Sequence, residues 1–190
     1  MKAKHIHSKD SKARARQVVS VARLPRLGGR AGAGVLRLGA GAWPCRLGEA
    51  AVAVLKHEGD RATPAGRFRL LRVLYRADRI RRPAAALPIR AIRRRDGWCD
   101  APGDRNYNRP VRLPYGASAE ELWRKDRLYD LVVVLGHNDR PRVKGRGSAV
   151  FLHVAPPGGA PTAGCVALAC ADLARLLARL RPGDRLAVRP

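Results

Sequence analysis

Short apolar runs separated by turn residues extend through most of the chain and predict a β-rich fold. Strands are expected over residues 18–24, 35–38, 51–55, 69–75, 131–135, 148–154 and 186–188. The run 131–135 is apolar at every position, which is typical of a strand buried on both faces. In the run 148–154, alternation with a period of two places Ala149, Phe151 and His153 on one face.

Two segments carry helical signals. Four leucines follow the i, i+3, i+4, i+7 spacing of an amphipathic helix over residues 172–180: Leu173, Leu176, Leu177 and Leu180. Ser118 and Glu121 have the spacing of a capping box, which predicts a short helix that carries Leu122 and Trp123. These elements together indicate one mainly β domain with short helices, of the α+β class, over residues 17–190.

The charge of the chain restricts its partners more than its fold. Among 190 residues there are 39 Lys and Arg against 15 Asp and Glu, which gives a formal net charge of +24. Such a charge favours nucleic acid, anionic lipid or an acidic polymer as partner. Residues 1–16 are basic and predict a disordered tail. Residues 67–95 hold eleven arginines and a single acid, so they form either a polymer-binding face or a solvated surface.

Membrane and export signals are missing from the sequence. No run reaches the roughly 20 apolar residues that a transmembrane helix needs. The apolar run after the basic tail is shorter than the roughly 7–15 residues of a secretory signal core. A cytoplasmic location, a different start and another export route therefore remain open.

Four cysteines are present, and none of them belongs to a Cys-x-x-Cys pair. A zinc ribbon or a thioredoxin-like site is therefore not expected, and neither a metal nor a cofactor is predicted. The sequence leaves open whether Cys45 and Cys99 form a disulfide. Together with Cys170, these two cysteines are otherwise expected to be structural.

His153 and Cys165 are the residues with candidate chemistry. His153 lies near the end of an apolar run, and Cys165 follows Gly164 after a loop rich in proline and glycine. An imidazole beside a thiol can produce a thiolate nucleophile. The N–H groups of Gly164 and Cys165 could hold a developing oxyanion, and the carbonyl of Val154 could orient the imidazole. The alternative is a buried structural cysteine and a packed histidine.

Three motifs in order resemble the YkuD-type L,D-transpeptidase catalytic domain: Thr63-Pro64-Ala65-Gly66-Arg67-Phe68, Phe151-Leu152-His153 and Thr162-Ala163-Gly164-Cys165. The resemblance covers roughly residues 18–188. It implies a YkuD-like β-sandwich domain and acyl transfer between donor and acceptor stem peptides of peptidoglycan. Cys165 would attack the donor stem to form a thioester, with His153 as base and with Gly164 supplying an oxyanion-hole amide. An acceptor amine would resolve the thioester into a 3-3 or 1-3 crosslink. Carbapenems often acylate the cysteine of this family.

The chain also departs from the family pattern. Val154 and Ala167 stand where family members usually carry Gly or Ser and Arg or Asn, and the loop before Thr162 is shorter. These departures imply a divergent short subgroup with an altered substrate pocket. Other side chains would then bind the substrate, and the candidates are Thr162, His137, Asn138, Arg109, Arg112, Tyr107 and Asn108. Trp98 would either line the cleft or pack in the core.

Two alternatives stay open beside the transpeptidase. Water could resolve the same thioester, which would make the protein an L,D-carboxypeptidase or endopeptidase. A protein of another class would be a basic nucleic-acid-binding or wall-binding protein on an inactive scaffold. The intact His153, Gly164 and Cys165 argue against that class, so no nucleic-acid partner is expected. An anionic wall polymer remains a candidate partner, and the periplasm or cell wall is the expected compartment because the substrate is there.

Overall fold

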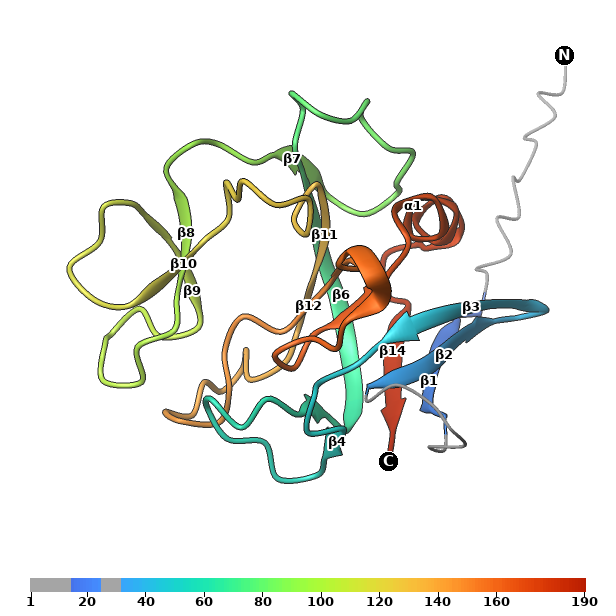
Figure 1. Cartoon of the computed structure of the whole chain (residues 1–190), viewed down its shortest axis with the longest axis horizontal. Coiled ribbons are helices and arrows are strands. Elements are labelled where there is room, and N and C mark those ends of the chain that lie inside the picture. Colours follow the sequence, from blue (N-terminus) through green and yellow to red (C-terminus); the bar gives the residue numbers. More distant parts are fainter. Residues whose placement is uncertain (1–14, 25–31) are drawn as a thin grey trace, which may run out of the picture.

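A β-sheet that closes on itself forms the centre of the molecule in a computed structural model, which describes residues 15–24 and 32–190 (Figure 1). Its strand order is β11-β12-β13-β3-β2-β1-β14-β6-β7, and β6 pairs again with β11, which closes the sheet and leaves β7 (Ile89–Ala91) outside the closure. The strands are β1 (Val18–Arg23), β2 (Ala33–Leu38), β3 (Gly41–Arg46), β6 (Gly66–Tyr75), β11 (Leu131–Leu135), β12 (Phe151–Val154), β13 (Val166–Leu168) and β14 (Arg185–Arg189). The mainly β prediction is confirmed, but the sheet is barrel-like, and the β-sandwich detail is not confirmed.

Smaller elements surround the barrel. A three-stranded sheet in the order β10-β8-β9 lies to its side in Figure 1. The remaining elements are β4 (Val52–Ala53), β5 (Thr63–Pro64), β7 (Ile89–Ala91), β8 (Asp96–Cys99), β9 (Arg109–Arg112), β10 (Ala119–Glu121), the helix α1 (Cys170–Arg179) and a 3-10 turn at Pro157–Gly159. The described residues thus contain one α-helix. The predicted basic tail falls almost wholly in residues 1–14, outside the described residues.

Two apolar clusters account for the strand patterns. The first contains Leu131, Val133 and Leu135 of β11 together with the inward residues of the other barrel strands. The second contains Val132 and Val134 of the same strand together with Trp98 and Tyr129. β11 is apolar at every position because its two faces lie in different clusters. Trp98 is a core residue and does not line the cleft.

The capping-box prediction is wrong. Residues 119–121 form strand β10, in which Ala119 pairs with Cys99 and Glu121 with Gly97. Leu122, directly after the strand, is completely buried in the second cluster. Pairing with β8 and burial of Leu122 outweigh a capping signal that is local and weak.

The four cysteines are free thiols. Cys45 lies in β3 with its side chain in the first cluster, and Cys99 is buried in β8. The Cys45–Cys99 disulfide left open by the sequence is therefore not formed.

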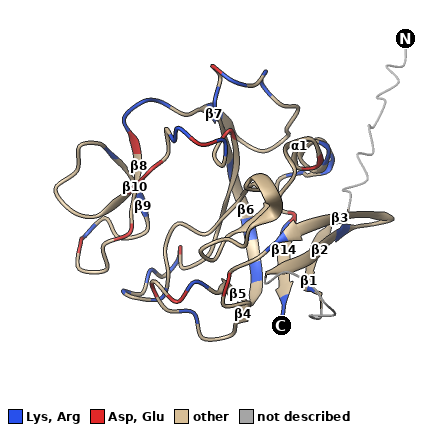
Figure 2. Cartoon of the chain, viewed as in Figure 1, with Lys and Arg blue, Asp and Glu red and all other residues tan. Residues whose placement is uncertain are grey.

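Arginines of the basic segment 67–95 take part in holding the fold. Arg69 pairs with Asp139, Arg79 with Asp130 and Arg90 with Asp96. Figure 2 shows Lys and Arg distributed over β6, α1 and several loops. Part of the charge in this segment is thus neutralised within the molecule.

The leucines of α1 attach the helix to the barrel, as the sequence predicted. Leu173, Leu176 and Leu177 are fully buried in the first cluster.

We expect Leu176→Ala to lower the free energy of unfolding by about 2–5 kcal/mol, because it removes buried methyl groups and leaves a cavity. Urea denaturation measures this loss. Leu55→Ala is the matched control, since Leu55 is 69% exposed and its truncation should change stability by less than about 0.5 kcal/mol.

Candidate active site

Parallel pairing of β12 with β13 brings the candidate histidine and cysteine together. His153 pairs with Ala167, and Leu152 pairs with Val166. Residues two apart on a strand share a face, so His153 and Cys165 lie diagonally on the outer face of the barrel. Both line one cavity of about 690 Å³. The motifs that are separate in sequence therefore meet in one site.

The backbone of Cys165 is held by two threonines. The hydroxyl of Thr162 donates to the Cys165 carbonyl at 2.7 Å, and the hydroxyl of Thr63 donates to the same oxygen at 3.2 Å. Thr63 comes from the Thr-Pro turn, so this motif contacts the cysteine directly. The interaction joins two motifs that lie far apart in the sequence.

Gly164 makes the tight turn before the cysteine. Its φ is 132°, and a Cβ at this position would lie 2.9 Å from the carbonyl oxygen of Ala62. Only glycine fits this conformation and this close approach. The Gly164 N–H donates to Thr162 Oγ1 at 3.1 Å. That amide is engaged in this structure, so it is not directed at a substrate oxygen.

The thiol of Cys165 is hydrogen-bonded to the backbone. It donates to the carbonyl of Ala149 at 3.3 Å and accepts from the Phe151 N–H at 3.3 Å. The residue is partly exposed to the cavity, but its sulfur is desolvated, and this burial raises the pKa of the thiol to about 12. Cys165 is therefore a neutral thiol at pH 7.

His153 is neutral as well. Its Nδ1 lies 2.8 Å from the Val154 carbonyl oxygen, and its ring packs edge-on against Tyr129 with centroids 5.4 Å apart. A carbonyl only accepts, so Nδ1 carries the proton and Nε2 keeps a lone pair. Burial lowers the pKa of His153 to about 4. The contact between His153 and Val154 is the one that the sequence suggested.

The resting site is thus a thiol and an imidazole rather than a thiolate and an imidazolium. Burial disfavours both charged forms, and this effect outweighs the attraction that an ion pair would gain. The imidazole can still remove the thiol proton as the sulfur attacks, when the charge passes to the substrate oxygen. The arrangement supports general-base catalysis.

Asn108, a predicted substrate-binding residue, lies in the interior and not in the cavity. It is buried, and its side-chain oxygen accepts from the Trp98 indole at 2.9 Å and from the Ala149 N–H at 3.2 Å. Its side-chain nitrogen donates to the carbonyls of His137 and Asn138. Asn108 therefore joins the three-stranded sheet to the segment that binds the Cys165 thiol, and it does not line the cavity.

Thr162 is the one predicted substrate-binding residue that lines the cavity; the structure describes all the others, and they lie elsewhere. Tyr107 is buried and donates to Glu58. His137 contacts the Arg146 carbonyl, and Asn138 donates to the Gly147 carbonyl, so both shape the loop before β12. Arg109 is exposed on β9, and Arg112 lines a separate hollow rich in arginine.

Charged residues that the sequence analysis missed line the cavity in their place. Lys56 and Arg124 supply cationic groups, and Glu120 supplies a carboxyl that accepts from the Tyr129 hydroxyl. Arg124 lies 3.5 Å from Glu120. Burial raises the pKa of Glu120. Lys56 lies in a polar run just before the Thr-Pro turn. No other sequence pattern pointed to these charged residues as part of the site.

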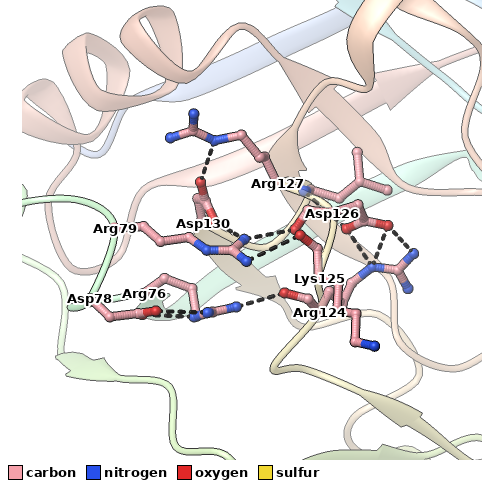
Figure 3. Close-up of polar contacts among 9 residues, drawn as sticks. Arg76, Asp78, Arg79, Arg124, Lys125, Asp126, Arg127 and Asp130 are labelled. Atoms are coloured by element: carbon pink, nitrogen blue, oxygen red, sulfur yellow. Dashed lines mark hydrogen bonds and ion pairs between the residues drawn. The ribbon is translucent and has the colours of Figure 1, made fainter.

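An ion-pair network holds the loop of residues 124–130, which supplies Arg124 to the cavity (Figure 3). Arg76 is buried, donates to the Arg124 carbonyl at 2.7 Å and lies over the Trp123 ring at 3.7 Å. Arg79 donates to the carbonyls of Lys125 and Asp126. Arginines of the basic segment therefore fix one side of the cavity.

The described part of the chain offers no group of three or more His, Cys, Asp or Glu side chains suited to a metal ion. Within residues 15–24 and 32–190, no helix has the length and apolar character needed to cross a membrane.

A histidine oriented by a backbone carbonyl, in one cavity with a cysteine directly before the neighbouring strand, is typical of a cysteine-dependent acyl-transfer enzyme. The family model of the YkuD L,D-transpeptidase catalytic domain matches residues 33–188. The chain belongs to this family, and the resemblance drawn from its motifs is confirmed. Comparisons with curated proteins and with solved structures gave no match.

The ionisation state of Cys165 can be tested by alkylation. With a pKa of about 12, the rate with iodoacetamide should rise about tenfold per pH unit from pH 7 to 10, because only the thiolate reacts. Mass spectrometry of the Cys165 peptide measures this rate, with a small free thiol as reference. A plateau below pH 9 would instead show a thiolate stabilised by His153.

Proposed function

We propose that this protein is a peptidoglycan L,D-transpeptidase with Cys165 as nucleophile and His153 as general base. The observation that carries the proposal is the histidine and the cysteine in one cavity, with Nδ1 of His153 bound to the Val154 carbonyl so that Nε2 keeps a lone pair. Membership of the YkuD family supplies the substrate class, which is peptidoglycan.

The proposed acylation begins when Nε2 of His153 takes the thiol proton. Cys165 Sγ forms a bond to the donor carbonyl carbon, and the carbonyl electron pair moves to its oxygen. Collapse of this intermediate breaks the bond to the terminal D-residue, whose amine leaves with the proton from His153. The product is a thioester on Cys165 and a free D-amino acid.

Transfer to an acceptor completes the proposed reaction. The acceptor-stem amine attacks the thioester, His153 takes the proton of that amine, and Cys165 leaves as the thiol. The crosslink formed is 3-3 or 1-3. We place the reaction in the periplasm or cell wall, where the polymer lies, and the excess of positive charge would favour association with an anionic wall polymer.

Product analysis tests the proposal directly. Wild-type protein incubated with purified tetrapeptide and pentapeptide muropeptides should give crosslinked dimers, and Cys165→Ala should give none. Mass spectrometry detects the dimers, and fragmentation assigns the linkage. Cys170→Ala is the matched control and should keep the activity, because Cys170 lies in α1 and does not line the cavity. Shortened monomers without dimers would identify a carboxypeptidase, and dimers formed by Cys165→Ala would refute the role of the cysteine.

The acid side of the pH profile tests the role of His153. With a pKa of about 4, the imidazole stays neutral on going from pH 7 to pH 5, so acylation should fall by less than about 1.5-fold. An ordinary histidine would lose about 25-fold over the same range, as its base form becomes protonated. The measurement is the rate of D-amino-acid release at both pH values, with circular dichroism as the control for folding. A 25-fold fall would exclude a buried neutral base.

A further inference from the structure

Lys56 is a buried charged residue in the cavity that the proposed mechanism leaves unused. It is 7% exposed, and it lines the cavity together with Cys165 and Gly164. Burying an ammonium is costly unless it is paired, and Lys56 forms an ion pair with Asp60. The cost of burying the Lys56 ammonium suggests that its charge has a function in the cavity.

The carboxylate of Asp60 holds the ammonium in position. Asp60 also accepts the N–H of His57 at 2.8 Å and the N–H of Ala62 at 2.9 Å. Burial alone would raise the pKa of Asp60, but the amide of His57, the Lys56 ammonium and the amide of Ala62 together lower it. The carboxylate is therefore fixed and charged. An ammonium has three donors, so Lys56 keeps donors for a further acceptor.

Two glycines make room for this lysine. A Cβ on Gly147 would lie 2.8 Å from Lys56 Cγ, and Gly147 has a φ of 87°. A Cβ on Gly164 would lie 3.5 Å from Lys56 Nζ. The ammonium thus reaches the peptide just before the nucleophile from the open side of the glycine turn.

One of the two backbone amides expected at the oxyanion is already engaged. An acyl-transfer site needs donors directed at the oxygen that becomes negative. The Gly164 N–H already donates to Thr162. The Lys56 ammonium lies beside the same glycine, and its charge favours the ionised form of Cys165.

We propose that the Lys56 ammonium is a catalytic group that stabilises the oxyanion formed when Cys165 attacks a carbonyl. As the bond between Sγ and the carbonyl carbon forms, the carbonyl π electrons move to oxygen, and Lys56 donates a hydrogen bond to that oxygen without losing its proton. When the intermediate collapses, the electron pair returns and the leaving group departs. The inference rests on the proposed function for its natural substrate.

Two reactions of the Cys165 thiol distinguish stabilisation of the oxyanion from an effect of Lys56 on the thiol alone. Acylation by p-nitrophenyl acetate passes through an oxyanion and releases p-nitrophenolate, whereas alkylation by iodoacetamide forms no oxyanion. Lys56→Met should slow the acylation of Cys165 about a hundredfold, which is the usual effect of losing one oxyanion donor. Alkylation should slow by less than about tenfold, because only the ionisation of the thiol changes. Cys165→Ala supplies the background rate.

Lys144→Met is the matched control. Lys144 is exposed and lies outside the cavity, so this variant loses the same charge and should keep both rates. Equal slowing of acylation and alkylation by Lys56→Met would overturn the proposal, since Lys56 would then act only on the thiol. Unchanged acylation would overturn it as well.

A second variant keeps the test decisive if Lys56→Met does not fold. Lys56→Met alone leaves the carboxylate of Asp60 without its ion-pair partner, whereas Lys56→Met combined with Asp60→Asn removes both charges. If circular dichroism shows that the single variant is unfolded, the double variant should show the same selective loss of acylation. The probes contain no peptide, so an inactive wild type on muropeptides would refute the transpeptidase while the result for Lys56 would stand.

Discussion

Parallel pairing between β12 and β13 places His153 and Cys165 on the same face, and the rest of the site is arranged around that register. β12 is held from its other side by β11, where Val132 pairs with His153. β13 is held by β3, where Cys45 pairs with Leu168. A slip of one residue in either pairing would turn the histidine or the cysteine toward the barrel interior. The closed barrel therefore determines which side chains face the cavity.

The charge of the site differs from that of the chain. Among the described residues that line the cavity, four are acidic (Glu58, Asp100, Glu120, Glu121) and three are basic (Lys56, Arg61, Arg124). The whole chain has 39 basic and 15 acidic residues. Most arginines therefore lie elsewhere, and some of them hold loops and strands through ion pairs. The net charge of the protein gives little information on the chemistry of its cavity.

The sequence predicted the candidate histidine and cysteine and much of the fold from local patterns. Alternation and apolar runs predicted most of the barrel strands but not β3 or β13, and leucine spacing predicted α1. The motif order pointed to His153 and Cys165 as candidates. The sequence failed where contacts between distant segments decide the structure. Residues 119–121 form a strand because β8 lies beside them. Asn108, predicted to bind substrate, joins the three-stranded sheet to the segment before β12. Lys56 reaches Gly164 across the fold, and no local pattern marks that contact.

The neutral resting state of Cys165 also affects how readily its sulfur is oxidised. Peroxides and disulfides react with a thiol mainly through its thiolate, and susceptibility to oxidation follows thiolate character. A thiol that is desolvated, and that donates its proton to the Ala149 carbonyl, has very little thiolate at neutral pH. The same burial that keeps the Cys165 thiol neutral therefore protects its sulfur from conversion to sulfenic acid.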